Sequence, residues 1–206
     1  MDVIYNPINN QEIRRRAKEP TDFIFPDDTF NIVAVGRLSR VKGFERLIRA
    51  CVKLKQRFNI RLYIIGGGEE ARLLTLIKEN QADSYISLLG YQENPYSLVS
   101  QASLFVCSSY REGYSTSVIE SLVLGVPVVT TLCSGMEEIL GNDNQYGMIV
   151  ENSENGIYQG ISQMLSETDT HEYYRDKASE RGAEFSLEKG VAAVRSHFNR
   201  CCGKIE

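Results

Sequence analysis

Residues 31–43 read NIVAVGRLSRVKG, a short apolar run with β-branched residues followed by a turn that begins at a glycine. The run is too short to be a helix and is typical of a buried strand. From Phe44 to Phe58, apolar residues then recur at helical spacing. This stretch therefore predicts a strand, a turn and a helix in succession, which is the repeating unit of an α/β fold.

The same pattern recurs along the chain as far as Val150. Further apolar runs, separated by turns and helical periods, occupy residues 60–65, 86–89, 104–107, 126–130 and 148–150. Such alternation predicts a parallel sheet of about six strands with helices on both faces. Because ligands bind sheets of this kind at the carboxyl ends of the strands, we expect function in the strand-to-helix turns.

The two ends of the chain differ from this central pattern. Asn and Pro residues interrupt any helical period before residue 31, so residues 1–28 are interpreted as an entry segment or interdomain linker. Residues 29–182 form the expected ligand-binding domain, in which apolar residues after Val150 have helical spacing. Breaks near Gly182 and Phe185 predict three helices there, the last within residues 183–206 and frayed from Arg200.

Composition excludes several classes of protein. The 206 residues include 23 Lys and Arg against 27 Asp and Glu, a formal net charge of -4, so a nucleic-acid partner is not expected. The five cysteines form no C-x-x-C pair and there are two histidines, which argues against a metal site. No apolar run approaches the roughly 20 residues of a membrane span. Residues 1–10 lack a secretory leader, so we expect a cytoplasmic protein.

The turn after the first predicted strand is suited to a phosphate or diphosphate. Gly36 allows close backbone approach, the helix beginning near Gly43 presents free N–H groups, and Arg37 and Lys42 add two cations. The alternative is a solvated loop in which Gly36 only makes the turn. The glycines at residues 66–68 lack the dinucleotide-binding spacing and are interpreted as mainly structural, with close backbone approach to a ligand as a secondary role.

The most informative turn is residues 108–121, SSYREGYSTSVIES. A helix beginning near Ser115 or Thr116 could hold an anion, while Glu112 and Glu120 are acceptors suited to sugar or ribose hydroxyls. Two acids beside one anion site suggest a ligand that carries both groups. The alternative is a capping box, in which Glu120 returns to the backbone N–H of Ser117, with Glu112 an exposed loop acid.

Together these turns resemble the donor-nucleotide-binding C-terminal domain of the family 4 retaining glycosyltransferases. The matching segments, in chain order, are residues 4–7, Gly36-Arg37 with Lys42-Gly43, residues 89–95, Glu112 and Glu120 around residues 113–115, residues 125–129 and residues 134–139. The resemblance covers most of residues 31–165 and implies a Rossmann-like domain, one half of a GT-B fold. One departure is Ser115, where family members often have glycine.

The resemblance also implies roles for individual residues. Arg37 and Lys42 would neutralise the leaving diphosphate, Glu112 would bind hydroxyls of the donor sugar, and Glu120 would hold the ribose. Contacts to the sugar, phosphate and base would come from the following residues: Gly36, Tyr91, Gln92, Gly113, Tyr114, Ser115 and Thr116. The nucleotide diphosphate-sugar would be the donor substrate, with no metal or other cofactor.

The resemblance implies that the acceptor is bound elsewhere. The family's N-terminal acceptor-binding domain has no counterpart in these residues, so we expect a chain that carries half of an enzyme and is inactive alone. The acceptor would be a glycan or lipid-linked glycan, and the missing half allows peripheral membrane contact. Two alternatives stay open: half of a nucleotide-sugar epimerase, and a non-catalytic nucleotide-sugar-binding module. Glu112 and Glu120 beside Arg37 and Lys42 favour transfer.

Overall fold

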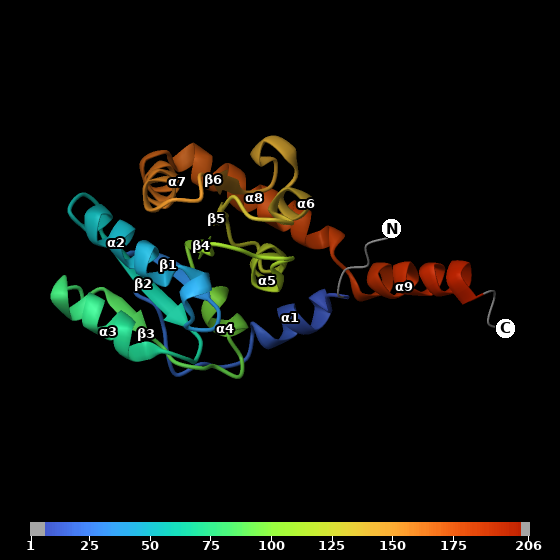
Figure 1. Cartoon of the computed structure of the whole chain (residues 1–206), viewed down its shortest axis with the longest axis horizontal. Helices are drawn as coiled ribbons and strands as arrows, with labels where there is room; N and C mark the ends of the chain where they lie inside the picture. The colour runs from blue at the N-terminus through green and yellow to red at the C-terminus, as the bar shows by residue number, and fades with distance from the viewer. Residues whose placement is uncertain (1–6, 203–206) are drawn as a thin grey trace.

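The computed structural model describes residues 7–202, which are organised around one parallel sheet (Figure 1). Within those residues the sheet has six strands, in the order β3-β2-β1-β4-β5-β6. Their bounds are β1 (Phe30–Val35), β2 (Ile60–Ile65), β3 (Ile86–Leu88), β4 (Leu104–Cys107), β5 (Val128–Thr131) and β6 (Met148–Val150). The order is that of Rossmann folds and places the topological switch point between β1 and β4. The expected strands are confirmed, each bound within two residues.

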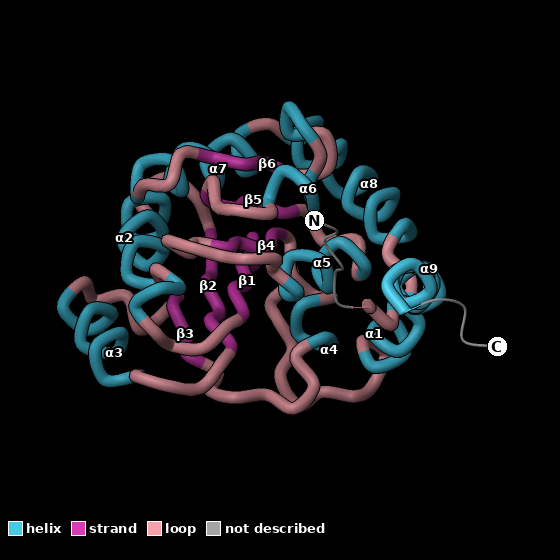
Figure 2. The backbone as a smooth tube through the Cα atoms, turned by 45° about the vertical axis from the view of Figure 1, so that its right-hand side comes forward, coloured by secondary structure: helices cyan, strands magenta, loops and turns pink. Residues whose placement is uncertain are grey.

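Helices cover both faces of the sheet, as expected (Figure 2). One face packs against α2 (Phe44–Lys55), α3 (Glu70–Glu79) and α7 (Glu154–Ser166). The other packs against α4 (Tyr96–Val99), α5 (Thr116–Val123) and α6 (Met136–Leu140). The α8 helix (Thr168–Glu184) contributes Tyr174 to the first face and Ala178 to the second. Short 3-10 helices occupy Arg40–Lys42 (η1) and Asn142–Asn144 (η2).

Burial on both faces explains why the strands are continuous apolar runs. In β1, Ile32 faces one layer of helices and Val33 the other, and both are fully buried. Such burial contributes about 1.5–3 kcal/mol for each aliphatic side chain. A rigid, doubly covered sheet of this kind fixes the positions of the turns at its carboxyl edge.

The N-terminal segment contains a helix that the sequence analysis did not predict, α1 (Asn10–Arg16). The Asn9 side chain caps this helix by accepting a hydrogen bond from the backbone N–H of Glu12 at 3.0 Å. Ile13 is its single buried residue and packs with α5 on the sheet's second face. Seven residues with one buried side chain give no detectable helical period, so the pattern showed only an entry segment.

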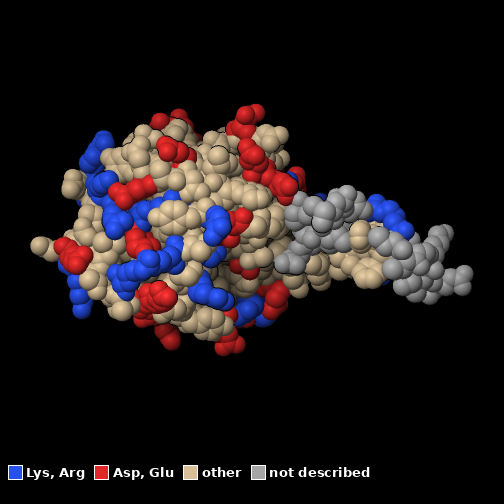
Figure 3. All heavy atoms as spheres, viewed as in Figure 1, with Lys and Arg blue, Asp and Glu red and all other residues tan. Residues whose placement is uncertain are grey.

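The chain after α8 forms the third expected helix, α9 (Leu187–Cys202), which extends away from the sheet (Figure 1). The fraying expected from Arg200 is wrong for residues 200–202, which continue α9. Residues 203–206, like residues 4–6 of the resemblance, lie outside the described residues. On the face in Figure 3, acidic and basic side chains are interspersed. Among the described helices, none is both long and apolar enough to cross a bilayer. The division at residues 28 and 182 stays a prediction.

Candidate functional site

The turns after β1 and β4 meet at the switch point through an ion pair. Lys42, at the end of η1, places its Nζ 2.7 Å from Oε1 of Glu112, which follows β4. The two side chains are 25% and 12% exposed. Ser109 donates a hydrogen bond to the same carboxylate oxygen at 2.5 Å, and the Cys107 thiol lies 3.9 Å from it. Glu112 is therefore a fixed, largely enclosed carboxylate and not a freely exposed loop acid.

Backbone contacts hold these two turns together. The Ser108 hydroxyl donates to the Lys42 carbonyl at 2.9 Å, and the Tyr110 N–H donates to the Val41 carbonyl at 2.8 Å. Gly43 has a φ of +63°, and a Cβ there would come within 2.2 Å of the Ser108 carbonyl oxygen. The close approach thus requires glycine at the start of α2.

Arg46 on α2 reinforces this junction and was missed by sequence reasoning. Its Nε and Nη2 donate to the Ser108 carbonyl oxygen at 2.9 and 2.6 Å, and its guanidinium lies 3.9 Å from the centroid of the Tyr110 ring. The residue is 3% exposed, and this burial lowers the pKa of its guanidinium. An arginine beside the apolar stripe of a helix gives little sequence signal, because it resembles a residue at the edge of the solvated face.

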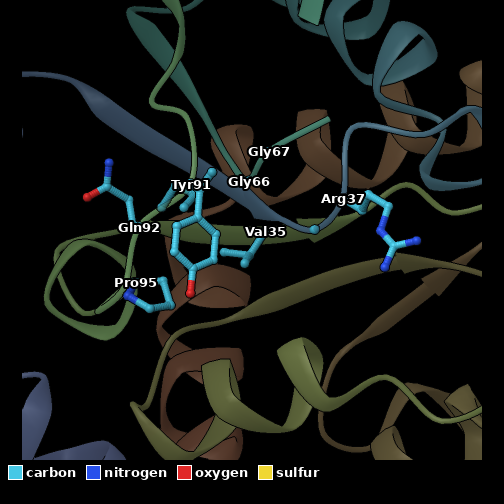
Figure 4. A pocket seen from close by; sticks show the side chains of 9 residues that line it. Val35, Arg37, Gly66, Gly67, Tyr91, Gln92 and Pro95 are labelled. Carbon is cyan, nitrogen blue, oxygen red and sulfur yellow. The ribbon is translucent and has the colours of Figure 1, made fainter. Parts of the chain in front are cut away.

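A pocket of about 380 Å³ lies beside the ion pair, at the carboxyl ends of β1 and β2 (Figure 4). It is lined by Val35, Gly36, Arg37, Ile65, Gly66, Gly67, Tyr91, Gln92 and Pro95. The Tyr91 side chain is 78% exposed, and the Gln92 amide donates to the Leu89 carbonyl at 2.7 Å. Four of the residues expected to contact a ligand therefore line one cavity, with a flat aromatic ring at its mouth.

Gly36 joins this pocket to the ion pair. A Cβ on Gly36 would lie 3.1 Å from Cε of Lys42, so the lysine side chain passes directly beside the pocket wall. Figure 4 shows the exposed Arg37 side chain extending away from Tyr91 and Gln92. Lys42 and Glu112 are not pocket-lining residues, so the site is a continuous strip across β2, β1 and β4 with the pocket on one side.

The glycines at residues 66–68 have the structural role expected for them, and their approach to a ligand stays a prediction. Gly66 has a φ of +148°, and a Cβ there would come within 1.9 Å of the Gly36 carbonyl oxygen. Gly67 lines the pocket, and Leu38 pairs with Gly68 as an isolated parallel bridge. These glycines therefore dock the second turn onto the first and also leave room for a ligand.

The amino end of α5 lies in the same loop as Glu112. The helix begins at Thr116 with Ser115 at its N-cap, as expected, and no side chain caps its free N–H groups. Ser115 is 3% exposed, with its hydroxyl 3.2 Å from that of Ser117. Burial raises the pKa of the neighbouring Tyr114 hydroxyl. A Cβ at Gly113 would meet no heavy atom within 4 Å. Open space thus adjoins uncapped N–H groups, an arrangement suited to an anion.

The structure contradicts the capping-box interpretation of Glu120. Because Ser115 is the N-cap, Glu120 lies in the second turn of α5, and its Oε1 accepts a hydrogen bond from the Tyr96 hydroxyl at 3.0 Å. Burial raises the pKa of the Glu120 carboxyl, while the hydrogen bond from Tyr96 lowers it by a smaller amount. Burial and the nearby Glu120 carboxylate raise the pKa of Tyr96 to about 12.

Replacing Glu120 by glutamine separates a structural from a binding role. A carboxyl whose pKa is raised in the folded state stabilises the fold below its unfolded pKa of about 4.5, and this stability is lost as the pH rises through the folded pKa. Glu120→Gln should therefore leave the unfolding free energy at pH 7 unchanged or increased, yet weaken binding of the nucleotide that the sequence resemblance implies. Chemical denaturation and calorimetry measure the two effects, and a clear loss of apo stability with unchanged binding would refute the prediction.

The charged side chains indicate which kind of ligand the site suits. Within the part of the chain that the structure describes, no group of three or more His, Cys, Asp or Glu side chains is placed to hold a metal ion. Arg37 and Lys42 bring positive charge to the turn after β1. A Rossmann-like domain whose switch point carries two cations in one turn, an enclosed carboxylate and a free helix end is suited to a ligand with both phosphates and hydroxyls.

Residues 15–181 match the family described as Glycosyl transferases group 1, and the chain belongs to this family. A relative from Campylobacter jejuni is 36% identical over 191 residues, which cover 91% of this chain and 50% of that protein. It is named N-acetylgalactosamine-N,N'-diacetylbacillosaminyl-diphospho-undecaprenol 4-alpha-N-acetylgalactosaminyltransferase. The putative colanic acid biosynthesis glycosyltransferase WcaL of Escherichia coli is 30% identical over 158 residues, covering 71% of this chain and 38% of WcaL.

Solved structures share the fold. A glycosyltransferase from Rickettsia africae superposes with a TM-score of 0.83 at 20% identity, over 97% of this chain and 56% of that one. The Anabaena protein HepE, solved in complex with UDP and glucose, superposes with a TM-score of 0.82 at 16% identity, over 97% of this chain and 57% of HepE. This chain thus spans about half the length of these proteins, and it has the Rossmann-like fold of one half of a GT-B glycosyltransferase.

Proposed function

We propose that this chain is the donor-binding half of a retaining glycosyltransferase that uses a nucleotide diphosphate-sugar. The observation that carries the proposal is the 2.7 Å pair between Lys42 and Glu112, which brings a cation and an enclosed carboxylate together at the switch point of the sheet. A carboxylate repels phosphate but accepts hydrogen bonds from hydroxyls, so the pair marks the boundary between the diphosphate and the sugar.

The proposed roles follow the carboxyl edge of the sheet from β3 to β4. The base enters the pocket under Tyr91 and beside Gln92, with the ribose near Glu120. The diphosphate lies at Gly36 between Arg37, Lys42 and the N–H groups of residues 113–116. Glu112 accepts hydrogen bonds from the sugar hydroxyls. Membership of a transferase family, together with Glu112 beside Lys42, favours transfer over the epimerase and the non-catalytic module.

Charge development explains how these groups would accelerate transfer. As the glycosidic bond breaks, negative charge grows on the departing diphosphate, so cations and N–H groups already in place stabilise the transition state more than the ground state. Donors placed in this way contribute about 3–4 kcal/mol each in other enzymes. In this proposal Arg37 and Lys42 supply the positive charge, and no metal or other cofactor takes part.

The acceptor is inferred from the names of two relatives. The Campylobacter jejuni relative is named for a diphospho-undecaprenol acceptor, and WcaL for colanic acid biosynthesis. By that likeness we propose a glycan or lipid-linked glycan acceptor, bound by a second domain opposite this one. That domain would also make any peripheral contact with the membrane, with transfer taking place on the cytoplasmic side.

Nucleotide binding tests the proposal directly. UDP, GDP and ADP are titrated against the chain by thermal shift and calorimetry, with and without EDTA. At a concentration about 100 times the dissociation constant, linkage contributes roughly 2.7 kcal/mol, which should raise the melting temperature by about 5–10 °C. The shift should persist in EDTA. A chain that binds none of these nucleotides and no nucleotide sugar would refute the proposal.

The cations should account for most of that binding. Arg37→Ala combined with Lys42→Ala should weaken nucleotide binding about 100-fold or more, since each removes a charge-assisted contact of about 1.5–3 kcal/mol. Lys78→Ala, which removes an exposed lysine from the last turn of α3, is the matched control and should bind normally. If the double variant kept wild-type affinity, the diphosphate could not lie between these side chains.

A further inference from the structure

The arginines at residues 14–16, the densest basic run in the sequence, play no part in the function proposed above. They lie on α1, and each has a different partner. Arg14 donates to the Val123 carbonyl at the end of α5 at 3.2 Å, while Arg15 pairs with Glu12 and Glu19 on its own segment. Arg16 donates to the Glu93 carbonyl at 2.7 Å. Arg14 therefore ties α1 to α5, and Arg16 ties it to the loop that follows the pocket-lining Gln92.

Arg16 also approaches the residue that orients Glu120. Its guanidinium carbon lies 5.4 Å from the centroid of the Tyr96 ring, within the range of a cation–π interaction. The Asn94 side chain donates to the Arg16 carbonyl at 2.9 Å and to Glu19 at 2.8 Å. Residues 93–96, which follow the pocket-lining Tyr91 and Gln92, are thus fastened to α1 at several points.

Tyr96 leaves one side of the Glu120 carboxylate available. Among the described residues, the hydrogen bond from Tyr96 reaches Oε1 of Glu120, and none reaches Oε2. A carboxylate held at one oxygen and open at the other accepts hydroxyl hydrogen bonds in a fixed direction. Pro95, which precedes Tyr96, lines the pocket, so Tyr96 connects the pocket's loop to Glu120.

We propose that Arg16 and Tyr96 are positioning residues that hold Glu120 ready for the ribose hydroxyls of the nucleotide. The inference rests on the function proposed above and extends it, since it makes the entry helix α1 a working part of the nucleotide site. Tyr96 fixes the carboxylate through its hydroxyl, and Arg16 fixes Tyr96 and the preceding loop. Neither residue touches the reacting atoms.

The test compares a nucleotide with an analogue that lacks the ribose hydroxyls. Calorimetry measures the affinities of UDP and of its 2′,3′-dideoxy analogue, or of the GDP pair if wild type binds GDP more tightly. Tyr96→Phe removes the hydrogen bond that orients the Glu120 carboxylate and should weaken binding of the ribonucleotide about fivefold. Binding of the dideoxy analogue should change little, so discrimination between the two should fall. Arg16→Gln should also lower the affinity for the ribonucleotide and the discrimination against the dideoxy analogue, each by a smaller factor.

A pH series distinguishes positioning from simple packing. The titratable and charged groups around Glu120 are Tyr96 on α4, with Arg16 and Glu12 of α1 behind it. The Tyr96 hydrogen bond lowers the pKa of Glu120, so its loss should raise that pKa. Ribonucleotide binding by Tyr96→Phe should therefore decline at a higher pH than in wild type as the solution is acidified.

Arg15→Gln is the matched control, because it removes the same charge from the neighbouring position of α1 but lacks contact with Tyr96. It should bind both nucleotides as wild type does. If Tyr96→Phe kept the wild-type discrimination and pH profile, or weakened both nucleotides equally, the positioning role would be wrong. If wild type bound no nucleotide, the proposed function itself would fail, and that result is seen before any variant is made.

Discussion

Gly66→Ala should destabilise the domain strongly and abolish nucleotide binding. A Cβ at this position would come within 1.9 Å of the Gly36 carbonyl oxygen, and the φ of +148° is one that side-chain-bearing residues rarely adopt. The strained backbone alone costs about 1–3 kcal/mol, and the clash is with backbone that has no alternative rotamer. We expect a loss of roughly 3 kcal/mol or more in unfolding free energy, or about 6–12 °C in melting temperature.

Gly67→Ala provides the matched control one residue further along. Its Cβ would meet Cβ of Tyr91 at 3.6 Å, an ordinary van der Waals contact, and its φ is not positive. The variant should keep nearly wild-type stability, with at most a modest effect on nucleotide binding. Urea denaturation and calorimetry on both variants measure the contrast. Equal stability of the two variants would show that the contact of the turn after β2 with Gly36 contributes nothing to the unfolding free energy.

The sheet could be predicted from sequence because each strand is buried on both faces. Double burial turns each strand into a continuous apolar run, and β2 was anticipated with its bounds, Ile60–Ile65. The turns could be predicted as well, because Gly36, Lys42 and Glu112 place a glycine, a cation and a carboxylate in the segments that follow those runs. Local sequence therefore placed the ion pair's two members in the right turns, and the topology joined them.

The supporting contacts could not be predicted in the same way. Arg46 and Ser108 are 62 positions apart in sequence, and Tyr96 and Glu120 are 24 apart. Such contacts exist only once the sheet and its helices have assembled, and a tyrosine or arginine near a helix start carries no signal of its partner. The capping-box reading of Glu120 failed for the same reason, because it considered only residues within one helical turn.

The Lys42–Glu112 ion pair and the Arg46–Ser108 hydrogen bonds both lie at the switch point of the Rossmann strand order. At the switch point the chain leaves β1 toward one face of the sheet and β4 toward the other, so the two turns diverge and leave a crevice between them. Lys42 and Glu112 close the floor of that crevice by a charged contact. Arg46 on α2 joins the two turns by hydrogen bonds to the Ser108 carbonyl.

Arg46→Met should therefore weaken both stability and nucleotide binding, for a reason that involves two opposing effects. Removing a buried charge recovers some desolvation energy, and burial already lowers the pKa of Arg46. Against this, the Ser108 carbonyl loses both of its guanidinium donors, and an unpaired buried acceptor costs about 1–3 kcal/mol. The stacking on Tyr110 is lost as well. We expect a net loss of about 2 kcal/mol, or about 4–8 °C in melting temperature.

The effect on the ligand distinguishes Arg46 from an ordinary buried residue. Because the Ser108 carbonyl lies in the turn that carries Ser109 and Glu112, Arg46→Met should release that turn and weaken binding of nucleotide sugars more than binding of the nucleoside diphosphate alone. Arg49→Met, three residues along α2 and exposed, is the control and should change neither quantity. Chemical denaturation and paired calorimetric titrations supply the measurements. Equal weakening of both ligands would mean that Arg46 supports the fold without orienting the carboxylate.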